Sequence, residues 1–311
     1  MRFFCTFFTL CFSLYHFSAN AETAFALGTG YRQDSLNWSI EGPDGFPNIL
    51  SELKWKDIKL WQVSARAKQT LLGLCLNAEA DYAFAFEGKN RDSDYLGDNR
   101  TLEFSRSYSD ASNGHAFDLS ASLGWNINFF ISPLSICPQI GFSYHEQHFT
   151  MRDGVYEIDL FNGNNGPFDG LDSSYTARWQ GPWIGVESCF CLYCPLSIYG
   201  GVRASALRYN ARGHWNLRTD FADDFRHEGY GYGLFGRLGV QYEFAPCIAI
   251  GILGSYQEFR VCHGHDRMYF NVDFVDGNGN SIVSGVESSS TRLHQVEWRS
   301  FRIQIYLALN F

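Results

Sequence analysis

The residues at 301–311, "FRIQIYLALNF", alternate strictly between large apolar side chains and other side chains. The odd positions carry Phe301, Ile303, Ile305, Leu307, Leu309 and Phe311. Successive side chains of a β-strand point to opposite faces, so the segment predicts a strand with one apolar face. Its length matches the ~9–11 residues that a tilted strand needs to cross a bilayer. A terminal edge strand of a soluble sandwich is the alternative, but so apolar an edge would promote aggregation.

The same alternation recurs along the whole chain. A period-two template finds segments at 25–31, 55–68, 72–86, 117–125, 134–144, 176–190, 196–209, 230–244, 248–256 and 293–311. Short connectors fall near 69–71, 126–131, 191–195 and 245–246, and long polar ones near 32–54, 87–114, 150–175, 210–228 and 262–292. An even strand number with this rhythm is typical of outer-membrane barrels. We therefore predict an all-β fold, a transmembrane antiparallel up-and-down β-barrel of about ten strands with long extracellular loops and short periplasmic turns.

The second face of the predicted strands is polar and carries both signs of charge. This face includes Asn77, Glu79, Asp81, Arg237, Gln241 and Glu243. A closed barrel satisfies its backbone polar groups internally, as lipid requires, and such side chains would then pair inside it. Eight strands leave an interior filled by side chains, whereas open channels go with roughly 16–18 strands. Ten strands therefore predict a narrow, plugged lumen.

The first residues, "MRFFCTFFTLCFSLYHFSANAE", predict a secretory signal peptide over residues 1–21. Arg2 precedes an apolar run, and Ala19-Asn20-Ala21 forms an A-x-A cleavage pattern. Beyond residue 20 no stretch of 18 apolar residues predicts a membrane helix. We expect one domain over residues 22–311, located in the outer membrane and in contact with its lipid. The net charge of −9 comes with mixed signs and no basic stripe, which argues against a nucleic-acid partner.

The cysteines beyond the signal peptide gather at one end of the predicted barrel. Cys75, Cys137, Cys189, Cys191, Cys194 and Cys247 fall at or near periplasmic turns, whereas Cys262 falls at the external rim. In an oxidising compartment this arrangement predicts disulfides, within the turns or to other cysteine-containing envelope proteins. Small buried residues near the lipid rim are the alternative. The spacing of Cys189, Cys191 and Cys194 suits zinc, but no second Cys/His pair follows in register. We therefore predict no metal and no cofactor.

Several short motifs resemble the omptin family of outer-membrane aspartyl-type endoproteases. They are "SELKWK" at 51–56, "GKNRDSDYLGD" at 88–98, "GFSYHEQHFTMRDGVY" at 141–156 and "GPWIGV" at 181–186. The sequence is also similar to the Protochlamydia outer membrane protein family, through "LKWKDIKLWQ" at 53–62 and "WQGPWIG" at 179–185. That likeness implies an envelope barrel with a loosely porin-like role.

The omptin resemblance implies a catalytic site at the barrel mouth, in which an aspartate pair faces an Asp-x-His motif. Asp92 and Asp94 match the pair. The fourth loop contains His214, Asp220, Asp224 and His227 but no Asp-x-His. A water-activating dyad therefore requires Asp220 or Asp224 to reach a histidine in three dimensions.

The lipopolysaccharide contacts that the same resemblance implies are only partly present. Arg178 matches one basic position of that site, so lipopolysaccharide is a candidate partner. Glu146, however, stands where an anionic lipid would need a cation.

We favour a non-enzymatic envelope barrel with a structural, adhesive or narrow-channel role. An omptin-like endoprotease with Asp92, Asp94 and a displaced histidine is the first alternative, and a diffusion porin is the second.

Overall fold

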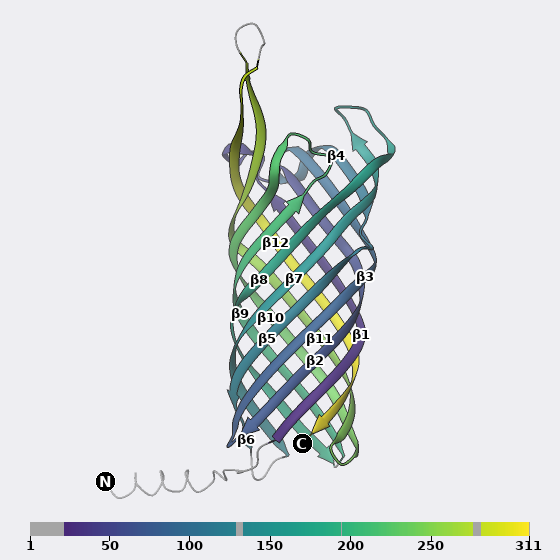
Figure 1. The fold of residues 1–311 in the computed structure, drawn as a ribbon, viewed down its shortest axis with the longest axis vertical. Helices are drawn as coiled ribbons and strands as arrows, with labels where there is room; N and C mark the ends of the chain where they lie inside the picture. Colours follow the sequence, from purple (N-terminus) through teal and green to yellow (C-terminus); the bar gives the residue numbers. More distant parts are fainter. Residues whose placement is uncertain (1–21, 129–132, 194, 276–280, 311) are drawn as a thin grey trace, which may run out of the picture.

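A computed structural model describes residues 22–128, 133–193, 195–275 and 281–310 (Figure 1). The predicted signal peptide at residues 1–21, together with Cys194 and Phe311, lies outside the described residues. The strands are β1 (Glu22–Ile40), β2 (Ser51–Leu71), β3 (Leu74–Gly97), β4 (Thr101–Asp110), β5 (Gly114–Trp125), β6 (Ile127–Asn128), β7 (Leu134–Asp159), β8 (Gly166–Tyr193), β9 (Leu196–His214), β10 (Phe221–Ala245), β11 (Ile248–Val275) and β12 (Ser281–Asn310). Two short 3₁₀ helices, η1 (Pro43–Gly45) and η2 (Asp98–Arg100), lie in connectors. Within the described ranges no helix is long and apolar enough to cross a membrane.

The strands close into a ring, as the sequence predicts. Neighbours in the chain pair antiparallel, and β1 pairs with β12 from Ala24↔Asn310 to Ile40↔Leu293. The strands β4 and β5 occupy one position, because both lie between β3 and β7, and the two-residue β6 pairs only with β7. Ten strand positions therefore surround the lumen in the described part of the chain. The prediction of about ten strands is confirmed.

The two faces of the wall have opposite character. Outward side chains such as Leu27, Ile140 and Ile184 are apolar and exposed, which is the surface that lipid covers. Inward side chains such as Arg32 and Gln62 are polar and buried. The predicted polarity of the two faces is confirmed.

The strands are much longer than the sequence pattern predicted. They reach 30 residues in β12, against the ~9–11 that a bilayer requires. The connectors expected to be loops at 87–114, 150–175 and 262–292 are largely paired strand, so the barrel wall continues beyond the apolar belt. Figure 1 shows the start of β1 and the end of β12 at one end of the barrel and the β11–β12 hairpin projecting from the other. The two strands of this hairpin stay paired beyond the apolar belt, because antiparallel hydrogen bonds satisfy their N–H and C=O groups outside the membrane as well.

Candidate functional site

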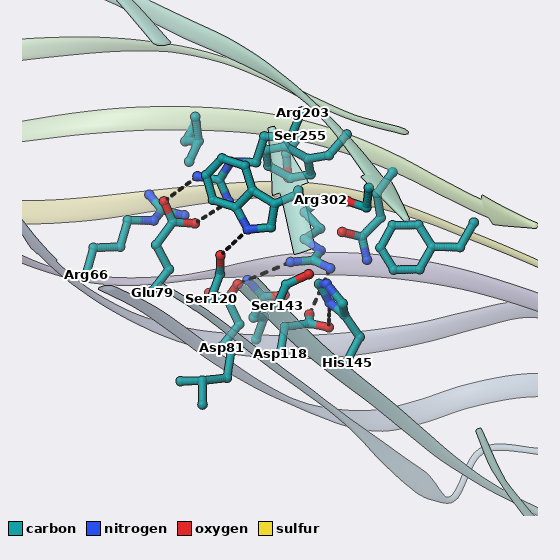
Figure 2. A pocket seen from close by; sticks show the side chains of 18 of the residues that line it. Arg66, Glu79, Asp81, Asp118, Ser120, Ser143, His145, Arg203, Ser255 and Arg302 are labelled. Atoms are coloured by element: carbon teal, nitrogen blue, oxygen red, sulfur yellow. Dashed lines mark hydrogen bonds and ion pairs between the residues drawn. The ribbon is translucent and has the colours of Figure 1, made fainter. Parts of the chain in front are cut away.

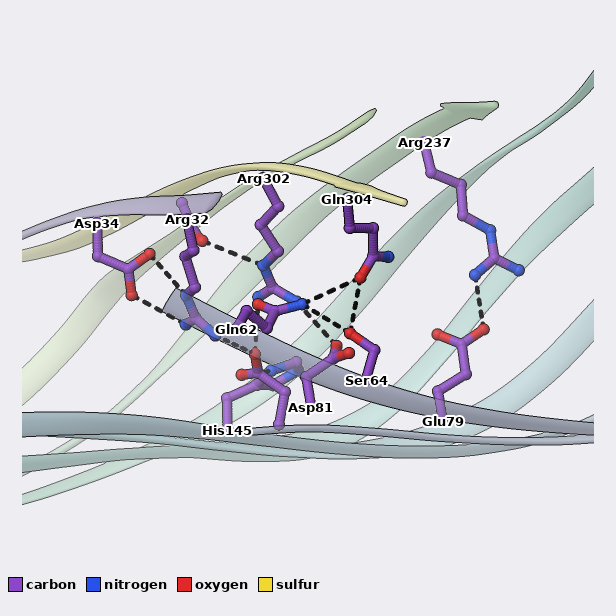
Figure 3. A network of polar contacts seen from close by, with 12 residues as sticks. Arg32, Asp34, Gln62, Ser64, Glu79, Asp81, His145, Arg237, Arg302 and Gln304 are labelled. Atoms are coloured by element: carbon purple, nitrogen blue, oxygen red, sulfur yellow. Dashed lines mark hydrogen bonds and ion pairs between the residues drawn. The ribbon is translucent and has the colours of Figure 1, made fainter. Parts of the chain in front are cut away.

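The middle of the lumen is crossed by a cluster of buried ion pairs (Figure 3). Arg32 of β1 binds both carboxylate oxygens of Asp34 at 2.9 Å and reaches Asp118 of β5 at 2.6 Å. From β12, Arg302 contacts Asp118 at 2.8 Å and Asp81 of β3 at 3.1 Å. These residues are at most 9 % exposed, and buried charges are tolerated only when they are paired and hydrogen-bonded. The cluster therefore ties opposite walls of the barrel together.

His145 of β7 completes this cluster. Its Nδ1 lies 2.7 Å from Asp118 Oδ1, and its ring packs edge-on against Phe259 with centroids 4.9 Å apart. Figure 2 shows His145 and Asp118 beside Arg302 at the wall of the space that remains. That space is only about 40 Å³, enough for a few water molecules.

An aromatic layer fills the lumen between the ion-pair cluster and the extracellular mouth. Tyr175 forms its centre, with hydroxyl contacts of 2.6 Å to Tyr209 and 2.7 Å to His227 Nδ1. Trp298 donates from Nε1 to Asp34 at 3.2 Å and so joins this layer to the ion pairs. The other large rings of the layer are Trp38, Trp55, Phe149, Trp179, Phe225 and Phe259. Two consecutive layers of side chains thus close the barrel.

Asp92 and Asp94 lie at the barrel mouth, where β3 continues beyond the apolar belt. Asp92 is paired across the strands with the buried Leu53, so both carboxyl groups point inward. Burial raises the pKa of both groups, and the charge of Asp94 raises the pKa of Asp92 further. Arg218 attracts both carboxylates and is itself paired with Asp220 at 2.7 Å.

The structure brings His214 and Asp224 together, as a displaced dyad requires. His214 Nδ1 lies 2.8 Å from Asp224 Oδ1, and the two residues face each other across β9 and β10. Tyr209, Ala211 and Phe225 on these strands are buried inward, so the alternate positions His214 and Asp224 point outward. The dyad and the aspartate pair therefore lie on opposite faces of the barrel wall.

The other histidine of the fourth connector, His227, is fully buried in the aromatic layer. Its Nε2 lies 3.1 Å from Asp266 Oδ1, and its Nδ1 contacts Tyr175. A substrate entering the mouth cannot reach its ring without displacing the aromatic layer. Asp220, the remaining candidate, is exposed and paired with Arg218.

Arg178, the candidate lipid contact, lies on the outer face of β8. Its Nε donates to Glu146 at 2.6 Å, and Tyr144 donates to the same carboxylate at 2.7 Å. The guanidinium is half exposed, but its charge is already matched by Glu146.

The six described cysteines are free thiols. Cys75 and Cys137 are buried, Cys189 and Cys191 are partly buried, and Cys247 and Cys262 are exposed. Cys75 lies opposite Gly124, which lies opposite Gln139, so β3 and β7 are separated by two strand spacings, about 9.6 Å. A disulfide requires Cα atoms within about 7 Å, so Cys75 and Cys137 cannot be bridged without moving the backbone. Among the described residues no group of three His, Cys, Asp or Glu side chains is placed to hold a metal ion.

The sequence pattern assigned Glu79, Asp81, Asp118, Arg237 and Arg302 to the non-apolar faces of their strands, but it did not show which of these charges pair. Arg32 was missed because it follows directly after the segment assigned at 25–31. Asp34 and His145 were missed because they follow the segments assigned at 25–31 and 134–144. The strands that contain them, β1 and β7, continue well beyond those segments.

Comparisons with known proteins agree with this architecture. The model of the Protochlamydia outer membrane protein family matches residues 26–311. Among solved structures, the outer membrane protease OmpT from Escherichia coli superposes with a TM-score of 0.73 at 13% identity, over 96% of this chain and 99% of that chain. The translocator domain of the autotransporter NalP from Neisseria meningitidis gives a TM-score of 0.34 at 12% identity, over 97% of this chain and 93% of that chain.

A major outer membrane protein from Thermus thermophilus gives a TM-score of 0.33 at 13% identity, over 94% of this chain and 99% of that chain. A search of curated proteins finds no match. At these identities the likeness to OmpT shows the fold alone. The family match over residues 26–311 and the closed ring together establish that this chain is an outer-membrane β-barrel belonging to the Protochlamydia outer membrane protein family.

Proposed function

We propose that this protein is a sealed, non-enzymatic barrel that serves the envelope as a structural scaffold and carries protein surface outside the membrane. The observation that supports this most directly is the double closure of the lumen. The Arg32–Asp118–Arg302 cluster crosses the barrel, and the aromatic layer around Tyr175 covers it. Beyond the mouth, the β11–β12 hairpin supplies exposed surface without enclosing a channel (Figure 1).

The same closure argues against a diffusion porin. An aqueous pore needs a continuous polar path, whereas buried tryptophan, tyrosine and phenylalanine rings fill the extracellular half of this lumen. The narrow remaining space of about 40 Å³ at the ion pairs does not pass solutes.

Planar-bilayer recording of the refolded barrel tests this function. We expect no stepwise conductance from protein that is folded, as judged by its altered gel migration before and after boiling. Reproducible conductance steps from the wild-type protein would instead establish a channel and refute the sealed scaffold.

An omptin-like endoprotease is the second candidate, favoured by one specific observation. His214 and Asp224 form a dyad with a 2.8 Å contact, near the mouth of a barrel with the fold of OmpT. Asp92 and Asp94, however, point into the barrel, whereas His214 and Asp224 point outward. This argues against one catalytic site formed by all four, because a general base must lie within hydrogen-bond reach of the water that it activates.

Peptide cleavage separates this candidate from the scaffold. Wild type, Asp92→Asn, Asp94→Asn, His214→Asn and Asp224→Asn would be assayed in detergent, with and without lipopolysaccharide. We expect no cleavage above background from any of them. Wild-type cleavage that is lost in one aspartate variant of β3 and in His214→Asn would establish the protease.

A further inference from the structure

A second cavity lies in the lumen at the end where β1 begins and β12 ends, which is the end assigned to the periplasm. Its volume is about 260 Å³, enough for several water molecules. The residues near the strand ends include Ala24, Asn126 and Asn310. The charged residues that line it are Arg66, Lys68, Glu79, Glu187 and Arg237, and polar residues such as Asn77, Ser135, Ser197 and Gln241 line it as well. We call this space the vestibule.

The two carboxylates of the vestibule are already neutralised. Arg237 contacts Glu79 at 2.6 Å and also contacts Glu187. Arg203 contacts Glu79 at 2.8 Å and Glu187 at 3.2 Å. Two arginines and two glutamates therefore balance, and Glu79, Glu187 and Arg237 of this quartet line the vestibule. Figure 3 shows the contact between Arg237 and Glu79.

Arg66 and Lys68 remain as cations without an ion-pair partner among the described residues. Both lie on the inward face of β2, in the alternation that also places Gln62 and Ser64 inside. Figure 2 shows Arg66 beside Glu79, whose carboxylate is occupied by Arg203. The Nε of Arg66 is buried and makes no hydrogen bond to the protein. Cys137 and Cys189 line the same space as Lys68.

The described vestibule thus carries two positive charges more than its carboxylates balance. A cation inside a barrel wall attracts a counter-ion strongly, because the surrounding protein screens charge less than water does. Neutral hydroxyl and amide groups of Ser135, Ser197, Asn77 and Gln241 line the same space and can donate further hydrogen bonds. A doubly charged oxyanion matches both the excess charge and these donors.

We propose that the vestibule is a binding site for a phosphate group, entered from the periplasm and held by Arg66 and Lys68. The planar guanidinium of Arg66 suits two oxygens of one phosphate, and the ammonium of Lys68 supplies the second charge. Free phosphate and a phosphate monoester share this chemistry. The site is independent of the sealed scaffold proposed above, because the vestibule lies on the periplasmic side of the ion-pair cluster.

Isothermal titration calorimetry on the refolded barrel in detergent at pH 7 and low chloride tests the proposal. The probes are inorganic phosphate, glycerol phosphate and acetate. We expect phosphate to bind at one site, and acetate, with one charge, to bind several-fold more weakly. Binding of glycerol phosphate as tightly as inorganic phosphate would identify an ester as the natural source, and selective binding of inorganic phosphate would identify the free ion.

The variant Arg66→Gln/Lys68→Gln should weaken phosphate binding about tenfold or more, because charge-assisted hydrogen bonds are the strong ones. Lys56→Gln is the matched control, since Lys56 lies on the same strand but is exposed. Both variants must show the folded gel band of the wild type. An absence of phosphate binding by the wild type, equal binding by the double variant, or acetate binding as tight as phosphate would each overturn the proposal.

Discussion

At the scale of single residues, the ionised carboxylate of Asp92 at the barrel mouth destabilises the fold. Its carboxyl group points inward beside Asp94, and its Oδ1 is buried without a hydrogen-bond partner among the described residues. Burial and the neighbouring carboxylate raise its pKa, so the folded protein binds a proton there more tightly than the unfolded chain does. Stability therefore falls as the pH rises from the ordinary aspartate pKa of about 3.9 through the raised value.

Asp92→Asn should consequently stabilise the barrel at neutral pH. We expect a gain of about 1 kcal/mol or more at pH 7.5, since one pKa unit corresponds to ~1.36 kcal/mol. The gain should vanish near pH 3, where the wild-type carboxyl group is protonated as well. Urea unfolding midpoints at the two pH values measure this, with the exposed Asp44→Asn as the control. A gain of equal size at both pH values would show that charge is not the cause.

At the scale of elements, the packing of β10 depends on glycines at positions where its backbone closely approaches a neighbouring backbone or an aromatic ring. In β10, a Cβ added to Gly231 would lie 1.8 Å from the carbonyl oxygen of Arg260 on β11. A Cβ on Gly233 would lie 2.5 Å from the Phe259 ring. Gly236, farther along the same strand, has no atom within 4 Å of its Cβ position.

Gly231→Ala should therefore destabilise the barrel, whereas Gly236→Ala should not. Overpacking typically costs about 1–3 kcal/mol, and here the neighbouring atom is backbone and cannot rotate away. The fraction of protein that refolds into the compact gel band, with its urea midpoint, gives the comparison. Similar losses in both variants would point to a general intolerance of side chains in β10 rather than to the close approach.

At the scale of the whole molecule, two successive layers of side chains fill one lumen, and the hydrogen bond from Trp298 to Asp34 joins them. The ion pairs are held by strands from opposite walls, and the aromatic layer is held by packing. Removing only one layer leaves the other in place. In the bilayer recordings, Arg32→Ala/Arg302→Ala is therefore expected to stay closed. The same substitutions combined with Trp179→Ala and Tyr175→Ala should give conductance, provided that gel migration shows a folded barrel. A conducting Arg32→Ala/Arg302→Ala variant would show that the ion pairs alone form the seal.

Beyond the apolar belt, the direction in which a side chain points, into the lumen or outward, also depends on the pairing of strands across the whole molecule. The pairing of β2 with β3 shifts between Lys56 and Leu60, where Asp57 has a φ of 53°. This bulge reverses the alternation, so that Trp55 and Leu53 point inward together with Ile58 and Leu60. The pairing of β10 with β11 also shifts, between Val261 and His263. Counting by twos along the sequence fails at such positions.

The sequence alone determined the barrel, the strand number and the polarity of its two faces, because period-two alternation is a local property of each strand. It also indicated a plugged lumen, through charges of both signs on the inward face. Only the tertiary structure decided which charges pair, since Arg32 and Asp118 are 86 residues apart. It also decided that His214 meets Asp224 on the face opposite Asp92. Register and bulges between strands set that geometry, and they arise from long-range pairing that no local pattern contains.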